Sequence, residues 1–495
     1  MPQQARITVE ASHPIARIRP ELYSQFIEPL GKCVYEGIWV ADRPDIPQEN
    51  GMRTFALDAL RRLGPAAVRW PGGCFADQHH WREGIGDPAQ RPVRLNLWWG
   101  GFETHAFGTH EYFDFCERIG AFPYICGNVG SGTVAEMRDW LEYCNAEGPT
   151  TLTEERRKNG SAKPLGVRFW GVGNENYGCG GHMSPADYAA EYRKFATQLR
   201  RVDPSVELIA AGYTAEYNRK LLEALITERE QSRELIDHVA VHRFFRTGGH
   251  DVEFSEEDYY SSVAESLLLD GDIVKADGLF KNYEDPSKRI GLVIDEWGTW
   301  HSNAPRDDGL FQRNTMRDAV VAAGCLNTFT NWSQRVVLTS TAQAINVLTH
   351  VIAVDGRHAW LTPIFHVFEM VRNHVGNDAL TTNIVCPDLA GGDGSSGGVP
   401  QISASASADP ERRAGVVCAV NRHISEPADC TVAFADLSVQ SASASLLSES
   451  APNVFNDAAN PDRVTPSPTG VDVDNGGLRM ELPPHSVALF SVELT

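Results

Sequence analysis

The sequence predicts an α/β fold, a (β/α)8 TIM barrel followed by a C-terminal antiparallel β-sandwich domain. Two observations carry this prediction. Short apolar runs alternate with amphipathic helical segments up to about residue 375, and the pattern changes to short strand-like runs after about residue 377. A length of 495 residues also favours more than one domain, because single cores stop growing near about 250–300 residues.

Eight apolar runs are the expected barrel strands. Most are rich in Val, Ile and aromatic residues and too continuous for half-exposed strands, which is typical of parallel strands buried on both faces. The runs lie at residues 22–27, 66–70, 122–128, 167–172, 207–211, 238–242, 290–295 and 335–339. Amphipathic segments between them include 135–144, 185–201, 218–229 and 315–329. Repeated strand–helix units predict a parallel sheet, and a count of eight favours a closed barrel.

The C-terminal part follows a different pattern. Short runs separated by turn residues predict antiparallel strands of a sandwich, at 415–420, 430–434, 441–447 and 486–492. The glycine-rich segment 391–398 predicts a loop. The alternating stretch 5–10 is expected to add a strand to the same sandwich. The predicted domains are therefore a catalytic barrel, 18–376, and a sandwich, 377–495 with the N-terminal strand 1–17.

Composition and charge exclude several classes of protein. A net charge of −21 would repel a phosphate backbone, so no nucleic-acid partner is expected. The N-terminal stretch contains no long apolar run, so we expect neither an export signal nor a membrane span, and a cytoplasmic location. The 10 cysteines are scattered without a C-x-x-C pair, which predicts reduced thiols. No zinc spacing, Walker loop or G-x-G-x-x-G fingerprint is present, so no metal or organic cofactor is expected.

Two acidic loops follow buried strands and suggest a reaction. Glu175 lies in GVGNENYGCGG, after the fourth expected strand, and Glu296 lies in DEWGTWH, after the seventh. Taken singly, the first has the alternative of a glycine-rich turn with a solvated carboxylate, and the second that of a structural Asp–Glu pair at a barrel rim. Together they can face each other across a barrel mouth, where glycoside hydrolysis needs one carboxyl as acid and another as nucleophile or base. The flanking Trp297 and Trp300 suit the apolar faces of a sugar.

A third loop supplies a cation. Arg69 begins RWPGGCFADQHHW, directly after the second expected strand. Its guanidinium is expected to point into the carboxylate-lined mouth and hold the nucleophile ionised, and the alternative is a purely structural ion pair. Asp77, His79 and His80 raise the possibility of a metal, but no further ligand follows at a useful spacing, so none is expected.

These loops closely resemble those of glycoside hydrolase family 51, the α-L-arabinofuranosidases. The resemblance extends along nearly the whole chain, and the combination of many ordered motifs is far more specific than any one of them. The motifs that carry it lie at 18–39 (IRPELYSQFIEPLGKCVYEGIW), 69–73 (RWPGG), 81–86 (WREGIG), 128–133 (NVGSGT), 170–181 (WGVGNENYGCGG), 295–300 (DEWGTW), 342–348 (AQAINVL) and 483–487 (PPHSV).

The resemblance implies a retaining double displacement with Glu175 as acid/base and Glu296 as nucleophile. Asn174 matches a residue that binds the sugar 2-hydroxyl, Glu28 a carboxylate that binds furanose hydroxyls, and Gln343 a glutamine of the same pocket. The remaining expected sugar-binding residues are Arg69, Cys74, His242, Phe244 and Trp297. The resemblance also implies a barrel-plus-sandwich fold, no cofactor, and a homo-oligomer, either a hexamer or a trimer of dimers.

Four positions depart from the family pattern. Pro29 replaces a histidine after Glu28, Cys74 replaces an asparagine, Phe244 replaces a tyrosine, and Tyr177 replaces a tryptophan. A thiol is a weaker hydrogen-bond partner than an amide, and phenylalanine offers no hydroxyl. None of these changes removes a predicted catalytic carboxylate, so they bear on the sugar more than on the reaction.

Three functions remain open from the sequence. The first is an exo-acting arabinofuranosidase that works on arabinose-containing oligosaccharides. The second is the same chemistry on a β-D-galactofuranoside, a β-xyloside or a glucan. The third is a non-catalytic sugar-binding protein that kept the fold. A carboxyl separation of about 5–5.5 Å would support retention, and one near about 9 Å would support inversion.

Overall fold

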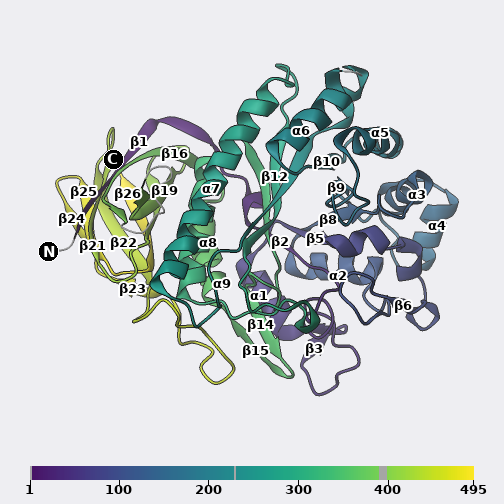
Figure 1. Ribbon diagram of the computed structural model, residues 1–495, viewed down its shortest axis with the longest axis horizontal. Helices are drawn as coiled ribbons and strands as arrows, with labels where there is room; N and C mark the ends of the chain where they lie inside the picture. The colour runs from purple at the N-terminus through teal and green to yellow at the C-terminus, as the bar shows by residue number, and fades with distance from the viewer. Residues whose placement is uncertain (1–2, 228–229, 390–397) are drawn as a thin grey trace.

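Eight parallel strands form a closed barrel in the computed structural model, which describes residues 3–227, 230–389 and 398–495 (Figure 1). All eight coincide with the predicted apolar runs, so the predicted barrel is confirmed. In order around the barrel they are β2 (Ser24–Phe26), β5 (Ala67–Trp70), β8 (Phe122–Gly127), β9 (Phe169–Val172), β10 (Glu207–Ala211), β11 (His238–Phe245), β12 (Gly291–Thr299) and β13 (Val336–Thr341).

Helices connect these strands and cover the outside of the barrel. They are α1 (Thr54–Leu63), α2 (Thr109–Ile119), α3 (Val134–Asn145), α4 (Thr151–Lys158), α5 (Pro185–Val202), α6 (Ala215–Leu222), α7 (Glu256–Lys281), α8 (Met316–Asn331) and α9 (Pro363–Val371). Local sequence sets their ends. Helix α5 begins where the Ser184 side chain accepts a hydrogen bond from the backbone N–H of Asp187, and α1 ends at Gly64, whose φ of 61° suits a residue without a Cβ.

Strand alternation decides which side chains enter the barrel. One layer of its interior consists of apolar side chains from seven strands, namely Ala67, Tyr124, Phe169, Ile209, Ala240, Val293 and Leu338. Two residues further along β5 and β11, at the carboxyl ends of the strands, the inward positions are Arg69 and His242. Charged and polar side chains therefore lie next to this apolar layer, at the carboxyl ends of the strands, where TIM barrels carry their active sites.

A second sheet contains ten strands and has its own apolar core, which includes Ile7, Val417 and Phe490. Its strand order is β23-β22-β26-β20-β19-β16-β1-β21-β25-β24. The N-terminal strand β1 pairs with β16 on one side and β21 on the other. The bounds are β1 (Gln3–Arg17), β16 (Asp378–Val385), β19 (Ile402–Ala408), β20 (Ala414–Asn421), β21 (Ala428–Phe434), β22 (Val439–Leu447), β23 (Ser467–Thr469), β24 (Asp472–Asp474), β25 (Gly477–Leu482) and β26 (Ser486–Leu494). The predicted sandwich is confirmed, and the loop predicted at 391–398 lies, except for Gly398, outside the described residues.

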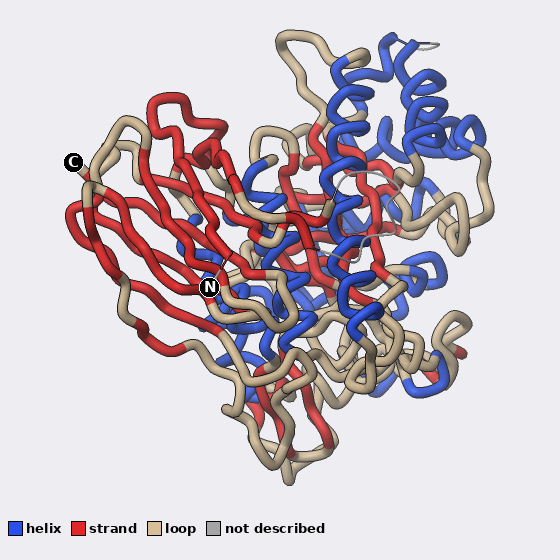
Figure 2. Tube along the Cα trace, turned by 60° about the vertical axis from the view of Figure 1, so that its left-hand side comes forward, coloured by secondary structure: helices blue, strands red, loops and turns tan. Residues whose placement is uncertain are grey.

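The sandwich packs beside the barrel through helices α8 and α9, and Figures 1 and 2 show its long strands on the left with the helices of the barrel to the right. Polar contacts join the two parts, such as the Asn331 side-chain amide donating to the Ala404 carbonyl at 3.0 Å. Four two-stranded sheets also occur in the described residues: β3–β4 (Gln48–Glu49, Met52–Arg53), β6–β7 (Arg94–Leu95, Phe102–Glu103), β14–β15 (Ile352–Asp355, His358–Leu361) and β17–β18 (Asp388–Leu389, Val399–Pro400).

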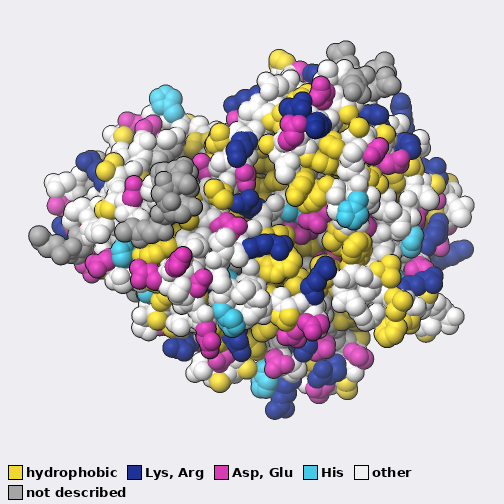
Figure 3. Space-filling view, in the orientation of Figure 1, with side chains coloured by type: hydrophobic (Ala, Val, Ile, Leu, Met, Phe, Trp, Pro, Cys, Tyr) yellow, Lys and Arg dark blue, Asp and Glu magenta, His cyan; other side chains and the backbone are white. Residues whose placement is uncertain are grey.

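The surface carries acidic and basic side chains side by side on the face in Figure 3, so the net charge of −21 is not gathered into one patch there. Across the three described ranges, every helix is too short or too polar to cross a membrane.

Candidate active site

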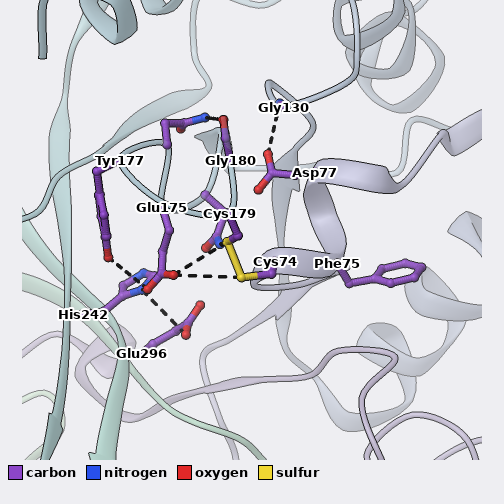
Figure 4. The surroundings of a disulfide bond; sticks show 12 residues. Cys74, Phe75, Asp77, Gly130, Glu175, Tyr177, Cys179, Gly180, His242 and Glu296 are labelled. Carbon is purple, nitrogen blue, oxygen red and sulfur yellow. Dashed lines mark hydrogen bonds and ion pairs between the residues drawn. A yellow bond between two sulfur atoms is a disulfide. The ribbon is translucent and has the colours of Figure 1, made fainter. Parts of the chain in front are cut away.

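Glu175 and Glu296 meet at the carboxyl ends of the barrel strands, together with His242 (Figure 4). One carboxylate oxygen from each glutamate and one imidazole nitrogen all lie within 4.8 Å of one another. Retaining glycosidases place their two carboxyl groups about 5–5.5 Å apart, whereas inverting ones leave about 6.5–9.5 Å for a water. The separation therefore fits direct attack by a carboxylate.

A β-bulge explains why two neighbouring acidic residues both reach inward. Val293 pairs with Ala240, and Glu296 pairs with His242, so β12 has one more residue than β11 between these two pairs. The extra residue breaks the strand alternation. Asp295 and Glu296 consequently both point into the barrel, although they are adjacent in sequence.

The same bulge turns Trp297 outward. Its ring is fully buried and packs against helices α8 and α9, stacked on Phe368 at 6.0 Å and edge-on to Phe329 at 5.3 Å. The prediction that Trp297 binds sugar is therefore wrong, because the residue after an inward pair returns to the outer face of the barrel.

Glu175 sits on a sharp turn directly after β9. Its own φ is 39°, a left-handed value that is uncommon for a residue with a side chain and often found at functional sites. Gly173 has a φ of 94°, and a Cβ there would lie 2.2 Å from the Asn176 amide oxygen, so this position requires glycine. The turn leaves the Glu175 side chain 25% exposed, against 10% for Glu296. Glu175 is thus the more accessible of the two carboxyl groups.

Arg69 is the cation that the sequence predicted at this mouth. Its buried guanidinium donates to Glu296 Oε1 at 2.7 Å and to the Asn174 amide oxygen at 2.6 Å, and its Nε lies 3.1 Å from Asp295 Oδ2. Tyr124 completes this group with a 2.6 Å hydrogen bond to the same Asp295 oxygen. The fork-like guanidinium holds both carboxylates in place.

His242 lies between three carboxylates. Its Nδ1 is 2.8 Å from Glu175 Oε1 and 3.6 Å from Glu296 Oε2, and its Nε2 is 3.3 Å from Asp295 Oδ1. Burial alone would lower the pKa of His242, but the charge of Glu296 and hydrogen bonds to Asp295 and Glu175 raise it to about 10. The imidazole is therefore protonated at neutral pH and keeps no lone pair for a metal.

The two glutamates have opposite pKa shifts. Burial raises the pKa of Glu296 against the opposing charges of His242 and Arg69. Burial acts in the same direction on Glu175, but hydrogen bonds from His242 and Tyr177 outweigh it and lower the pKa of that carboxyl. An acid at Glu175 needs the reverse, so a substrate that covers its exposed part would have to raise this pKa by desolvation.

Glu28 forms a second polar centre beside the carboxylate pair. Its oxygens accept hydrogen bonds from the Phe75 backbone N–H at 2.8 Å, the Trp99 indole at 2.9 Å and the Gln343 amide at 2.8 Å. Burial and the charge of Glu296 raise the pKa of Glu28 to about 7. The Gln343 amide oxygen is buried and has no hydrogen-bond partner among the described residues.

Cys74 and Cys179 form a disulfide beside Glu175, so the prediction of reduced thiols is wrong for this pair. The two cysteines are 105 residues apart, and only closure of the barrel brings their Cα atoms to 5.7 Å. Their sulfur atoms lie 4.0 and 3.7 Å from Glu175 Oε2. The expected role of Cys74 as a weak thiol donor is also wrong, because a disulfide carries no S–H. The other eight cysteines are free.

Two neighbours of the site were missed from the sequence. Tyr124 and Trp99 each donate to a site carboxylate, and only the WW pair at 98–99 gave any signal. Tyr177, which the sequence singled out only as a departure from the family pattern, also donates to Glu175. Phe244 lies two residues beyond His242 with its ring edge-on to Trp300 at 5.4 Å, and its role in sugar binding stays a prediction.

Two groups of potential metal ligands occur among the described residues, and both include Glu175. The first also contains Cys74 and Cys179, whose oxidised sulfurs offer no thiolate. The second contains the protonated His242. Neither donor set suits a metal, and the Asp77, His79 and His80 cluster is not such a group in the described ranges.

This protein has a TIM barrel with a close carboxylate pair at the ends of its fourth and seventh strands. This combination of fold and site places it in the class of glycoside hydrolases. Residues 59–255 match the "Alpha-L-arabinofuranosidase 1 domain" and residues 295–486 the "Alpha-L-arabinofuranosidase C-terminal domain". The intracellular exo-α-L-arabinofuranosidase of Bacteroides ovatus is 35% identical over 99% of this chain and 96% of that protein.

Solved structures agree. The GH51 arabinofuranosidase from Xanthomonas axonopodis pv. citri superimposes with a TM-score of 0.93 at 31% identity, over 99% of this chain and 100% of that one. The α-L-arabinofuranosidase from Thermotoga maritima gives 0.89 at 29% identity over the same shares. The chain belongs to glycoside hydrolase family 51, the α-L-arabinofuranosidases.

Proposed function

We propose that this protein releases non-reducing terminal α-L-arabinofuranose from arabinose-containing oligosaccharides through a covalent glycosyl-enzyme. The observation that carries the retaining mechanism is the 4.8 Å limit on the distance between carboxylate oxygens of Glu175 and Glu296. The names of relatives such as the B. ovatus enzyme support the sugar.

In the first step Glu175 protonates the glycosidic oxygen while Glu296 attacks the anomeric carbon. The bond to the leaving group breaks, an ester bond to Glu296 forms, and the leaving group departs with the proton. Oε1 of Glu296 is held by Arg69 at 2.7 Å, so Oε2, which is 3.6 Å from His242, is the freer oxygen for attack. Covering Glu175 with the leaving group raises its pKa from the lowered value that it has in the free protein, so that the carboxyl takes up the proton that it then donates.

In the second step Glu175, now a carboxylate, takes a proton from a water molecule that attacks the anomeric carbon. The ester bond to Glu296 breaks and the sugar leaves with its anomeric configuration retained. Glu28, Gln343 and Asn174 hold the furanose hydroxyls. The Asn174 amide oxygen is already bound to Arg69, so its NH2 group, which also contacts Cys179 Sγ at 3.6 Å, is the donor left for the sugar.

Release of 4-nitrophenol from its α-L-arabinofuranoside tests the proposal. On this activated substrate Glu296→Ala should lower kcat/KM by at least about 10²-fold, because the nucleophile is lost, and Glu175→Ala should lower kcat by at least about 10²-fold, because the base that hydrolyses the intermediate is lost. Glu216→Ala, at an exposed glutamate on α6, is the matched control and should behave as wild type. A fully active Glu296→Ala variant contradicts the assignment. Galactofuranosides and xylosides in the same panel test the sugar.

We propose in addition that the enzyme works in the cytoplasm on imported oligosaccharides, as part of arabinan catabolism. Relatives from B. ovatus, Streptomyces lividans and Bifidobacterium longum are named intracellular exo-arabinofuranosidases, which supports this location. We further propose a homo-oligomer, a hexamer or trimer of dimers, and light scattering on the purified protein would test it. We also propose two domains, a barrel at 18–376 and a sandwich at 377–495 with the N-terminal strand 1–17. The strands of the closed barrel all lie in the first range, and those of the ten-stranded sheet all lie in the second range or in strand 1–17, which supports this division.

A further inference from the structure

A stack of tyrosines stands beside Glu175 at the mouth. The rings of Tyr177 and Tyr213 lie face to face, with centroids 3.7 Å apart and planes 15° apart. Tyr217 packs edge-on to both, at 6.0 and 6.2 Å. Tyr213 is 51% exposed although one of its faces is covered by Tyr177, so its other face is open to solvent.

The hydroxyl of Tyr177 donates to Glu175 Oε1 at 3.0 Å, and Figure 4 shows it pointing at that carboxyl. Burial and the adjacent charge of Glu175 raise the pKa of Tyr177, so the phenol stays neutral and acts as a donor. His242 Nδ1 contacts the same oxygen at 2.8 Å. Oε1 thus receives two hydrogen bonds, one from the loop after β9 and one from strand β11.

The other oxygen of Glu175 has a different environment. In the described residues its neighbours within bonding reach are the disulfide sulfurs of Cys74 and Cys179, at 4.0 and 3.7 Å, which donate no hydrogen bond. With Oε1 saturated by donors, the proton that Glu175 delivers belongs on Oε2. The geometry therefore distinguishes the anchored oxygen from the reacting one.

We propose that Tyr177 is a positioning residue that anchors Oε1 of Glu175 and so presents Oε2 to the glycosidic oxygen, and that the open face of Tyr213 receives the leaving-group sugar. This rests on the proposed function, in which Glu175 is the acid. The acid must touch the glycosidic oxygen, so the half-exposed ring that flanks it lies on the leaving-group side. Tyrosine faces suit the C–H face of a sugar ring. Because the rings are stacked, a leaving group on Tyr213 holds Tyr177, and through it Glu175, in position.

Several charged groups face Glu175 and share in its titration. They come from different strands and loops around the mouth: Arg69, Asp77, His242 and Glu296. Tyr177→Phe leaves all of them in place and removes only one neutral donor. A shift in the pH profile of this variant therefore reports on the Tyr177 hydroxyl.

The test compares Tyr177→Phe with Tyr217→Phe, the same chemical change at a hydroxyl that donates to the Met183 carbonyl at 3.4 Å and not to Glu175. Each is assayed on an α-1,5-linked arabinobiose, whose poor leaving group needs the acid, and on the 4-nitrophenyl arabinofuranoside, whose good leaving group needs it less. For Tyr177→Phe we expect kcat/KM on arabinobiose to fall about tenfold and on the aryl glycoside only about threefold. Losing a donor to the carboxylate raises its pKa, so the alkaline limb should move up by about 0.5–1 pH unit.

Tyr213→Ala tests the platform, with Tyr213→Phe as its matched control. The alanine variant should raise KM for arabinobiose about tenfold, the loss expected from one stacking face, while the phenylalanine variant keeps the wild-type KM. Unchanged melting temperatures would show that all four variants fold.

The proposal is overturned if Tyr177→Phe leaves the alkaline limb in place, or lowers both substrates equally, since a purely structural role predicts that result. It is also overturned if Tyr213→Ala binds arabinobiose as the wild type does. If the wild-type protein hydrolyses neither substrate, the proposed function itself fails, and this outcome is distinct from the other two.

Discussion

Replacing Arg69 with methionine removes the cation that neutralises the buried carboxylates, while a side chain of similar length remains. In the wild type the guanidinium is 2% exposed and contacts Glu296 at 2.7 Å, Asp295 at 3.1 Å and Asn174 at 2.6 Å. Removing one partner of a buried ion pair costs about 3–5 kcal/mol, because the other charge stays buried. We expect the free energy of unfolding at pH 7 to fall by this amount.

The loss should shrink as the pH falls. Burial raises the pKa of Asp295, but Arg69 and His242 outweigh it and hold this pKa below its usual value of 3.8. A carboxylate with a depressed pKa stabilises the fold above its unfolded pKa and loses that contribution as the pH falls. The variant has less of this contribution to lose, so the two proteins should converge as the pH falls below 3.8, the usual pKa of this carboxyl.

Urea denaturation at pH 7 and at about pH 3 measures both effects. The control is Arg43→Met, at a surface pair with Asp45 whose side chains are 35% and 54% exposed, and it should leave the free energy of unfolding close to the wild-type value. If Arg69→Met costs less than about 1 kcal/mol at pH 7, or its cost grows on acidification, the electrostatic account of this centre is refuted.

Three further predictions concern the same site. The pKa of His242 is raised from 6.5 to about 10, so its contribution to stability is complete below about pH 6.5 and is lost as the pH rises through about 10. The free energy of unfolding of the wild type should therefore decline by up to about 5 kcal/mol over this range. Melting temperatures should fall accordingly in the wild type and not in His242→Gln. The pKa of Glu28 is raised to about 7, and its ionised form accepts hydrogen bonds from hydroxyls better than its neutral form. The KM of the wild type should therefore fall as the pH rises through about 7. In Glu28→Gln, steady-state kinetics should show a KM that does not change over this range. The Cys74–Cys179 disulfide closes a long loop, so its reduction should lower the free energy of unfolding by about 2–4 kcal/mol. The loss is the difference between urea melts recorded with and without dithiothreitol. The Cys74→Ala/Cys179→Ala double variant should not respond to the reductant.

The barrel could be predicted from sequence because strands buried on both faces leave a simple pattern. Most of the eight runs keep the apolar character that their two packed faces require, although the first includes the buried polar residues Ser24 and Gln25. The predicted carboxylates also come together, because the carboxyl ends of parallel strands meet at one face.

What the sequence hid depends on single-residue geometry and on contacts between distant segments. One extra residue in β12 decides that Asp295 and Glu296 point inward and Trp297 outward, and the letters DEW are compatible with either register. The Cys74–Cys179 bond joins loops 105 residues apart, so no spacing rule announces it. The hydrogen bond from Tyr177 to Glu175 likewise requires the turn at which Glu175 adopts a positive φ.

The most direct test of the central claim is to trap the glycosyl-enzyme. Glu175→Ala incubated with an activated aryl α-L-arabinofuranoside should accumulate the intermediate, because the base for its hydrolysis is gone while the leaving group needs no acid. Peptide mapping by mass spectrometry should then find one pentosyl group on the peptide that contains Glu296. A pentosyl group on another residue, or turnover with inverted anomeric configuration and no adduct, would contradict the account.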